Sequence, residues 1–328
     1  MGRSLEPLLT PEQIESRLNL WPGLDGGTAT LINLSENHTF RIDTPDGRAH
    51  ILRVHRPGYH TRQGIESELA WLDALYRDAG LPTITSIPGK NGNALQYVHF
   101  PETGIATFAV LFAFEEGQNA EELDDLVPLF ADLGRLSAIC HRHAEAWQPP
   151  AFFKRPVWDD NAILNPDGPW GNWRETSGVT PEILTLLTRL ERRLRDDLAA
   201  YGREKQRFGL IHADMRLANL LVHKGETRLI DFDDCGFGWF AYDFAAALSF
   251  FEDDPRVPEL KATWLEAYRK ERTFSAVDEA ALDTNLLLRR MALLAWIGSH
   301  AETSLAQSCQ PDFAENTAKM AEVYLTAR

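Results

Sequence analysis

The sequence predicts an α+β fold of two lobes, in which an antiparallel sheet comes first and helices dominate the remainder. Short β-like runs separated by turn residues occupy much of residues 28–114. Longer amphipathic patterns with apolar residues at helical spacing occupy much of residues 115–328. A chain of 328 residues suits one bilobal unit or two modest domains. We therefore expect an N-terminal lobe over residues 1–114 and a C-terminal lobe over residues 115–328.

The bulk composition is that of a globular protein, with 44% hydrophobic and 25% charged residues. A net charge of −15 argues against nucleic acid as the main partner, because binding phosphates requires clustered Lys and Arg. This charge would suit a cationic ligand, although a solvated acidic surface is the commoner explanation. Three widely spaced cysteines indicate neither a disulfide framework nor a metal knuckle. The N-terminus has no apolar signal core and no apolar run is long enough for a bilayer, so we expect a cytoplasmic protein without a membrane partner.

In the N-terminal lobe, turn and cap residues delimit the expected elements. Thr10 and Pro11 predict a helix start, and Pro45-Asp46-Gly47 predicts a tight turn. The expected elements are a helix over 9–21, strands over 28–34, 38–43 and 49–55, a helix over 64–79, and strands over 97–100 and 105–114. The last strand is almost wholly apolar, as is typical of a central strand.

In the C-terminal lobe, helical periodicity predicts most of the elements. The expected helices are 123–143, 182–201, 243–251, 257–272, 278–299 and 313–327. Between the second and third of these, apolar runs at 208–211 and 220–222 and a returning run at 228–230 predict strands. Lys224-Gly225-Glu226 is a hairpin turn signal between the last two.

This hairpin carries the residues that point to chemistry. His212-Ala213-Asp214 follows the first strand, Asn219 stands five residues after Asp214, and Asp231 follows the returning strand. We expect Asp214, Asn219 and Asp231 to lie close together. A carboxylate (Asp231) and an amide oxygen (Asn219) are ligands suited to Mg²⁺. A separate carboxylate (Asp214) can accept the proton of an attacking hydroxyl, so the set is one that phosphoryl transfer from a nucleotide requires.

Four sequence motifs resemble those of the aminoglycoside phosphotransferase/choline kinase branch of the protein-kinase-like fold. They are I-H-A-D, A-N-L-L, L-I-D-F-D-D and A-Y-D-F-A. Within this branch the sequence is most similar to bacterial homoserine-kinase-type and stress-response-kinase-type members. The resemblance implies ATP and Mg²⁺ as cofactors, Asp214 as catalytic base, and His212 as a structural support of the catalytic loop. Ala213 and Asp233 depart from the H-R-D and D-F-G of regulated protein kinases, which points to an enzyme that is not switched by phosphorylation of its activation loop.

The resemblance also implies a nucleotide site in the N-terminal lobe. Arg53 stands where relatives carry the phosphate-binding Lys or Arg, and Glu68 stands at the position of its helix partner, with Glu66 as the rival. Ser35 and Asn37, in a loop that lacks the kinase glycines, are candidates for binding phosphate oxygens. The segment 111–114, including Phe112 and Phe114, should meet the adenine edge through its backbone.

Two further residues gain roles from the resemblance. Arg216, two residues after Asp214, is expected to neutralise charge in the transition state. Asp243 is expected to be the N-cap of its helix and to accept hydrogen bonds from the backbone of the catalytic loop.

Several features leave alternatives open. His141 and His143 are better explained as helix-end residues than as metal ligands. The Trp-rich segment 147–173 could roof the acceptor site with Trp158, Asp159 and Asp160, or pack as an ordered loop on its own aromatic side chains. Trp296, His300 and Glu302 could line an acceptor pocket, although core packing is favoured for Trp296.

The predicted function is ATP-dependent transfer of a phosphoryl group to a hydroxyl of a small molecule, such as an amino alcohol, homoserine or an aminoglycoside. A protein Ser/Thr kinase and a nucleotide-binding scaffold without activity are the alternatives. The sequence leaves the acceptor and the oligomeric state open.

Overall fold

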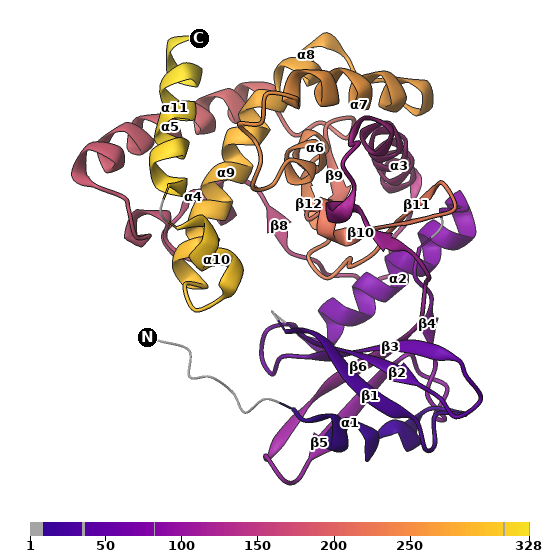
Figure 1. The fold of residues 1–328 in the computed structure, drawn as a ribbon. Helices are drawn as coiled ribbons and strands as arrows, with labels where there is room; N and C mark the ends of the chain where they lie inside the picture. The colour runs from indigo at the N-terminus through magenta and orange to yellow at the C-terminus, as the bar shows by residue number, and fades with distance from the viewer. Residues whose placement is uncertain (1–8, 35–36, 82, 311, 328) are drawn as a thin grey trace. The chain divides into compact units, whose positions relative to one another are not determined.

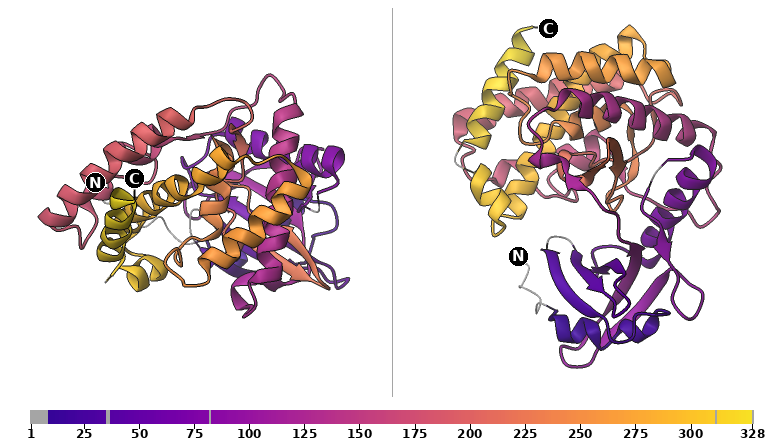
Figure 2. Two further views of the ribbon diagram at one scale, coloured as in Figure 1. Left: turned by 90° about the horizontal axis from the view of Figure 1, so that it is seen from above. Right: turned by 45° about the vertical axis from the view of Figure 1, so that its right-hand side comes forward.

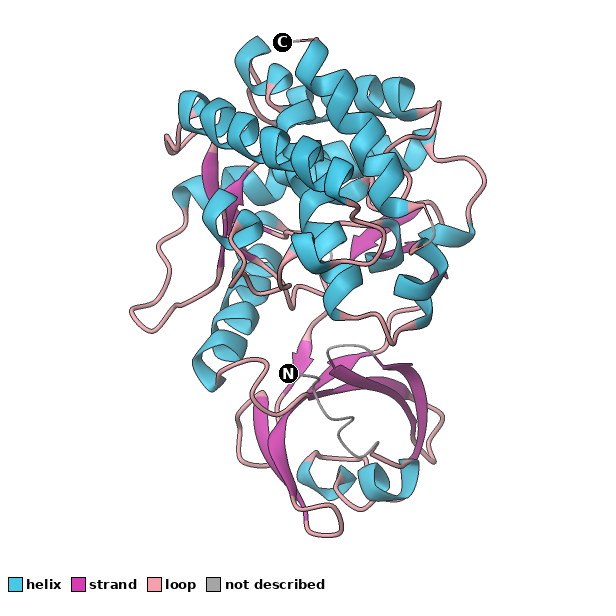
Figure 3. Ribbon diagram, turned by 90° about the vertical axis from the view of Figure 1, so that its left-hand side faces the viewer, coloured by secondary structure: helices cyan, strands magenta, loops and turns pink. Residues whose placement is uncertain are grey.

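The computed structural model describes residues 9–34, 37–81, 83–310 and 312–327. The chain forms two compact units. The first unit comprises Met1–Ala74, Pro82–Glu116 and Pro149–Lys154, and the second comprises Leu75–Leu81, Gly117–Gln148 and Arg155–Arg328. The first is built on an antiparallel sheet and the second is mainly helical (Figure 1, Figure 3), so the predicted α+β class is confirmed.

The sheet of the first unit has the order β1-β2-β3-β6-β4, and β5 also pairs with β6. All of its pairings are antiparallel. The strands are β1 (Thr28–Leu34), β2 (Asn37–Asp43), β3 (Ala49–His55), β4 (Ser86–Ile87), β5 (Leu95–Phe100) and β6 (Ile105–Ala113). The apolar strand β6 pairs with three others, as expected for a central strand.

A short α-helix and a 3₁₀ turn pack against the apolar face of this sheet. Helix α1 (Pro11–Glu15) begins with a capping box at Thr10, and a 3₁₀ turn, η1 (Leu18–Leu20), follows it. The prediction of one helix over 9–21 is therefore wrong. The change of helix type places Ile14, Leu18 and Trp21 together in the core formed with the strands. Helix α2 (Arg62–Ala79) is the predicted helix after β3.

In the second unit, α3 and α7 pack side by side (Figure 2). Gly134 allows their contact, since a Cβ at this position would overlap the carbonyl oxygen of Trp264. The long helices are α3 (Val127–Ala146), α5 (Pro181–Tyr201), α7 (Val257–Glu271), α9 (Leu282–Ser299) and α11 (Phe313–Thr326). The short ones are α4 (Asp160–Leu164), α6 (Ala241–Ala247), α8 (Ala276–Ala280) and α10 (Ser304–Cys309).

The predicted hairpin and the strand before it lie in two small sheets. The first has the order β11-β10-β7 and the second β8-β12-β9. Their strands are β7 (Gln118–Asn119), β8 (Val157–Trp158), β9 (Phe208–Ile211), β10 (Leu220–His223), β11 (Glu226–Leu229) and β12 (Gly236–Trp239). The predicted hairpin is confirmed, with left-handed backbone at Lys224 and Gly225. Strand β12 was not predicted. Its glycines permit close neighbours, because a Cβ at Gly236 would lie 2.6 Å from the carbonyl oxygen of Pro156.

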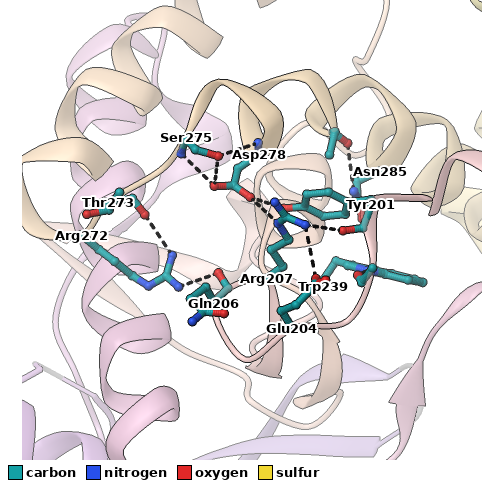
Figure 4. A network of polar contacts seen from close by, with 12 residues as sticks. Tyr201, Glu204, Gln206, Arg207, Trp239, Arg272, Thr273, Ser275, Asp278 and Asn285 are labelled. Atoms are coloured by element: carbon teal, nitrogen blue, oxygen red, sulfur yellow. Dashed lines mark hydrogen bonds and ion pairs between the residues drawn. The ribbon is translucent and has the colours of Figure 1, made fainter. Parts of the chain in front are cut away.

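The predicted helix over 278–299 is divided into α8 and α9. Ser275 forms a capping box with Asp278, which starts α8 at Ala276 and places Asp278 inside its first turn. The Asp278 carboxylate also accepts hydrogen bonds from Tyr201 Oη at 2.9 Å and Arg207 Nε at 3.2 Å (Figure 4). This network joins the end of α5 to α8, so Asp278 stabilises the packing of these helices.

A cavity of about 500 Å³ lies beside this network. Its lining consists of Glu145, Glu204, Gln206, Arg207, Arg272, Thr273, Ser275 and Asp278. The two arginines bind carboxylates and carbonyl groups of the same set, as for Arg272 with Glu145 and with the carbonyl of Gln206. None of the predicted site residues lies in it. Within the described ranges, no helix combines the length and the apolar character that crossing a bilayer requires.

Candidate active site

The hairpin brings the predicted base and one predicted metal ligand into contact. Asp214 follows β9, and Asn219 ends a 3₁₀ turn, η4 (Leu217–Asn219), directly before β10. The Nδ2 of Asn219 donates to the carbonyl oxygen of Asp214 at 2.9 Å and to its Oδ2 at 2.8 Å. On the other limb of the hairpin, the N–H of Ile230 donates to the carbonyl of Asn219 at 3.0 Å, which places Asp231 one residue beyond this link.

Backbone strain accompanies these residues. Ala213 has a φ of 67° and Asp231 has a φ of 58°, in the left-handed region that a residue with a Cβ rarely adopts. Such conformations cost on the order of 1–3 kcal/mol each and persist where the surrounding structure fixes them. Both positions are adjacent to or part of the predicted site, so the strain lies where the functional side chains are oriented.

Asp243 fixes the loop at Ala213. Its carboxylate accepts hydrogen bonds from the N–H of His212 at 3.1 Å and of Ala213 at 2.8 Å, as the family resemblance implies. The prediction that Asp243 is an N-cap is wrong, since α6 begins at Ala241 with Phe240 at the cap. Asp243 lies within the first turn of α6, where its side chain is fully buried and binds the backbone of the loop before Asp214.

His141 also contacts the carboxylate of Asp243. Its Nε2 lies 3.0 Å from Oδ2 of Asp243 and its Nδ1 lies 2.9 Å from Oη of Tyr268. The interpretation of His141 as a helix-end residue is therefore wrong, because it is fully buried within α3. Burial lowers the pKa of His141 even though Asp243 acts to raise it. His143 is paired with Asp78 at 3.5 Å.

His212 has the geometry of a structural residue. Its Nδ1 accepts from the N–H of Asp214 at 3.3 Å, and its Nε2 lies 3.1 Å from the carbonyl oxygen of Ile230. These partners define a neutral ring with the hydrogen on Nε2, because the carbonyl can only accept. Burial lowers the pKa of His212, which favours this neutral form. The ring thus ties the loop before Asp214 to the strand that leads to Asp231.

The carboxylate of Asp214 is surrounded by donors. Arg216 Nε lies 3.2 Å from Oδ2, and Arg289 Nη2 lies 2.6 Å from Oδ1. Burial acts to raise the pKa of Asp214, but the charges of Arg216 and Arg289 outweigh burial and hold this pKa below its ordinary value. Asp214 is therefore ionised at neutral pH. Arg289 was not predicted from the sequence as a site residue.

Arg216 lies near both acidic residues. Burial lowers its pKa, but Asp214 and also Asp231 act in the opposite direction, and the net pKa is raised. Arg216 is therefore a permanent cation, and 29% of its side chain is exposed. A partly exposed guanidinium beside the base and Asp231 is suited to the predicted neutralisation of phosphate charge.

The two predicted metal ligands suit a hard cation. Because Nδ2 of Asn219 is directed to Asp214, the amide oxygen is the atom that remains to coordinate a metal. An amide oxygen and the Asp231 carboxylate form an all-oxygen donor pair of the kind that Mg²⁺ takes together with phosphate oxygens. Among the described residues, no cluster of three His, Cys, Asp or Glu side chains forms a self-sufficient metal site.

In the first unit, Arg53 and Glu68 form the predicted ion pair. Nη2 of Arg53 lies 2.8 and 2.7 Å from the two carboxylate oxygens of Glu68. The rival Glu66 instead pairs with Arg62 on the exposed side of α2. The Arg53 guanidinium also lies over the ring of Phe112, at 5.1 Å from its centroid.

The other predicted nucleotide-binding residues have different placements. Ser35 lies outside the described residues, and Asn37 is buried at the start of β2. Phe112 lies inside β6 with β3 and β4 on its two sides. Phe114 follows the end of β6, and Arg41 packs on its ring at 4.4 Å. Strands pair with β6 on both sides of Phe112, so its backbone is less available to a ligand. Phe114 lies beyond the end of β6 and is the better candidate for a backbone contact with the nucleotide.

Residues 149–154 of the Trp-rich segment belong to the first unit, and the rest of the segment, which includes β8 and α4, belongs to the second. Trp158 is buried and donates to the carbonyl of Asp234 at 2.7 Å. Asp159 caps α4, and both Asp159 and Asp160 pair with Arg203. The hypothesis that Trp158, Asp159 and Asp160 face a ligand is not supported by this arrangement.

The end of α9 carries the remaining candidates. Trp296 is half-buried, and its ring stacks on that of His300 with ring centroids 4.9 Å apart. Phe250 packs against its other side at 6.2 Å. Glu302 is exposed. The Trp296 side chain, near the end of α9, is thus accessible in part.

Comparisons with known proteins identify similar chains. A model of the phosphotransferase enzyme family matches residues 28–280. Amicoumacin kinase of Bacillus subtilis (strain 168) is 24% identical over 291 residues, which are 87% of this chain and 82% of that protein. The structure of a microcompartment-associated aminopropanol kinase has a TM-score of 0.88 and 38% identity, covering 96% of this chain and 97% of that one. An amicoumacin kinase in complex with AMP-PNP and Ca²⁺ has a TM-score of 0.77 at 20% identity, covering 95% of this chain and 94% of that one.

Proposed function

Because this chain belongs to the phosphotransferase enzyme family, we propose that it transfers the γ-phosphate of ATP to the hydroxyl group of a small amino alcohol. The chain is a small-molecule kinase, and both its predicted protein-kinase-like fold and its predicted family are confirmed. The environment of Asp214 is the observation that carries the proposed reaction: an ionised carboxylate held by Arg216, Asn219 and Arg289.

In the proposed reaction, Asp214 orients the acceptor hydroxyl and accepts its proton. The hydroxyl oxygen forms a bond to the γ-phosphorus while the bond from this phosphorus to the oxygen of ADP breaks. Phosphoryl transfer has a loose transition state in which the attacking hydroxyl needs little activation. A carboxylate whose pKa is lowered is a weak base, and it suits a reaction in which orientation matters more than basicity.

The nucleotide is assigned to two sets of residues. Arg53, oriented by Glu68, would bind phosphate oxygens, and its fork allows it to do so while it holds the glutamate. Asn219 and Asp231 would hold Mg²⁺, which neutralises phosphate charge when it is bound. Arg216 would stabilise the charge on the transferred group.

The amino alcohol class is supported by sequence similarity and by charge. The aminopropanol kinase is 38% identical to this chain over nearly its whole length. The net charge of −15 favours the approach of a cation over that of an anion.

An ADP-release assay tests the acceptor class with a matched pair of substrates. We expect 1-amino-2-propanol, or a related amino alcohol such as ethanolamine, to give a much higher kcat/KM than 1,2-propanediol, in which a hydroxyl replaces the ammonium group. Equal activity with the diol would contradict a cationic acceptor. Phosphorylation of a generic protein such as casein, with none of the small alcohols, would favour a protein kinase. Nucleotide binding without ADP release across the panel would favour a scaffold.

A further inference from the structure

Arg289, on helix α9, reaches the predicted catalytic base from a distant part of the sequence. We propose that Arg289 is a positioning residue that fixes the orientation of the Asp214 carboxylate, an inference that rests on the proposed phosphotransferase reaction. Its Nη2 donates to Oδ1 of Asp214 at 2.6 Å, and its Nη1 donates to the carbonyl oxygen of Ala213 at 3.3 Å. One guanidinium group therefore binds both the base and the strained residue before it.

The guanidinium is itself immobilised. Its Nε donates to Oγ of Ser249 at 2.9 Å, and its Cζ lies 5.2 Å from the ring centroid of Trp170 and 5.8 Å from that of Tyr242. Only 1% of Arg289 is exposed. Its planar fork thus has a hydrogen-bond partner at each of its three nitrogens and aromatic rings nearby, which restricts its movement.

The donors to Asp214 divide between its two oxygens. Oδ2 receives hydrogen bonds from Arg216 and Asn219, whereas Oδ1 receives one from Arg289. The terminal torsion of an aspartate is broad, so donors on one oxygen alone define the carboxylate plane poorly. With a rigid donor on Oδ1, the plane is defined from both sides. A displacement of about 1 Å in a reacting group can lower a rate by roughly 100-fold.

The next residue of the same helix provides a contrast. Arg290 is also buried, at 3% exposure, but its partners are Glu252, Thr317 and the carbonyl of Phe313. Removal of Arg290 leaves the buried carboxylate of Glu252 without this ion pair, and removal of Arg289 takes from Asp214 one of its two arginine partners, so stability should fall in both cases. Only Arg289 contacts Asp214, so the two variants separate a role in stability from a role in positioning the base.

The experiment compares Arg289→Met, Arg289→Lys and Arg290→Met by steady-state kinetics at a temperature where each protein is folded, with the acceptor that wild type uses. We expect Arg289→Met to lower kcat by roughly 100-fold while the KM for ATP changes by less than about twofold. Arg289→Lys should recover little, because the donors of an ammonium group share one nitrogen and cannot reproduce the planar fork that reaches Ser249, Ala213 and Asp214. Arg290→Met should lose thermal stability and keep kcat within about twofold of wild type.

Chemical rescue provides a second measurement, which distinguishes the loss of the guanidinium group from a general loss of stability. In Arg289→Ala, guanidinium chloride at millimolar concentration should increase kcat several-fold, whereas it should not increase the kcat of Arg290→Ala. Turnover of Arg289→Met near the wild-type value, or equal losses of kcat in the Arg289 and Arg290 variants, would overturn the inference. The kcat of each variant is compared with the wild-type kcat on the same acceptor. If that acceptor is not an amino alcohol, the proposed substrate class is wrong, but the test of Arg289 still holds.

Discussion

Arg53 Nη2 lies 2.7 Å from Oε2 of Glu68, and 6% and 0% of the two side chains are exposed. Replacement of Glu68 by Gln leaves a buried guanidinium without its counter-charge. We expect the free energy of unfolding, measured by urea denaturation, to fall by about 3–5 kcal/mol. ATP affinity should also fall, because Arg53 loses the partner that orients it.

Glu66 is the matched control for this change. It lies on the same helix and pairs with Arg62, but 68% of the Arg62 side chain and 35% of the Glu66 side chain are exposed. Glu66→Gln should cost less than about 1 kcal/mol. Similar losses in both variants would show that the buried pair has no special role.

Asp231→Asn tests the predicted metal site. Asn tolerates the left-handed backbone that Asp231 adopts, so the change removes charge with little added strain. In wild type, we expect ATP to raise the melting temperature more in the presence of Mg²⁺ than in the presence of EDTA. The variant should lose this Mg²⁺-dependent part of the shift. An unchanged Mg²⁺-dependent shift would remove Asp231 from the metal site.

His141 predicts a pH dependence of stability. Burial lowers its pKa from the ordinary value of 6.5, so the folded state resists a proton that the unfolded state accepts. The stability that depends on neutral His141 is therefore present above pH 6.5 and is lost as the pH falls from 6.5 towards the lowered pKa of the folded state.

We expect the melting temperature of wild type to fall between pH 7.5 and 5.5, and that of His141→Gln to fall less steeply from a lower starting value. Thermal unfolding in a buffer series of constant ionic strength provides the measurement. The same slope in both proteins would show that His141 does not contribute to this dependence.

Local spacing predicted the catalytic hairpin well. Asp214, Asn219 and Asp231 are separated by one 3₁₀ turn and two short strands, so their sequence separation largely determines their positions. The Arg53–Glu68 pair was predicted by family resemblance rather than by spacing. In both cases the side chains belong to adjacent elements of the chain.

The contacts of Arg289 and His141 with residues distant in sequence were not predicted. Arg289 and Asp214 are 75 positions apart, and no local pattern joins them. A signal was available, however: Arg289-Arg290 stands in an otherwise apolar part of α9, where buried arginines require partners. The helix-end role of His141 and the N-cap role of Asp243 were wrong for a related reason, because helix-end preferences describe local energetics and not a contact across 102 residues.

Replacement of Asp214 by Asn tests the central claim most directly, because Asn keeps the size of the side chain and removes its ability to accept a proton. Turnover of the acceptor and binding of Mg-ATP should be measured in the same preparation. We predict that kcat falls by roughly 100-fold or more, in line with the loss of a general base, while ATP affinity remains close to that of wild type. Wild-type turnover in Asp214→Asn would contradict the assignment of the base and the mechanism built on it.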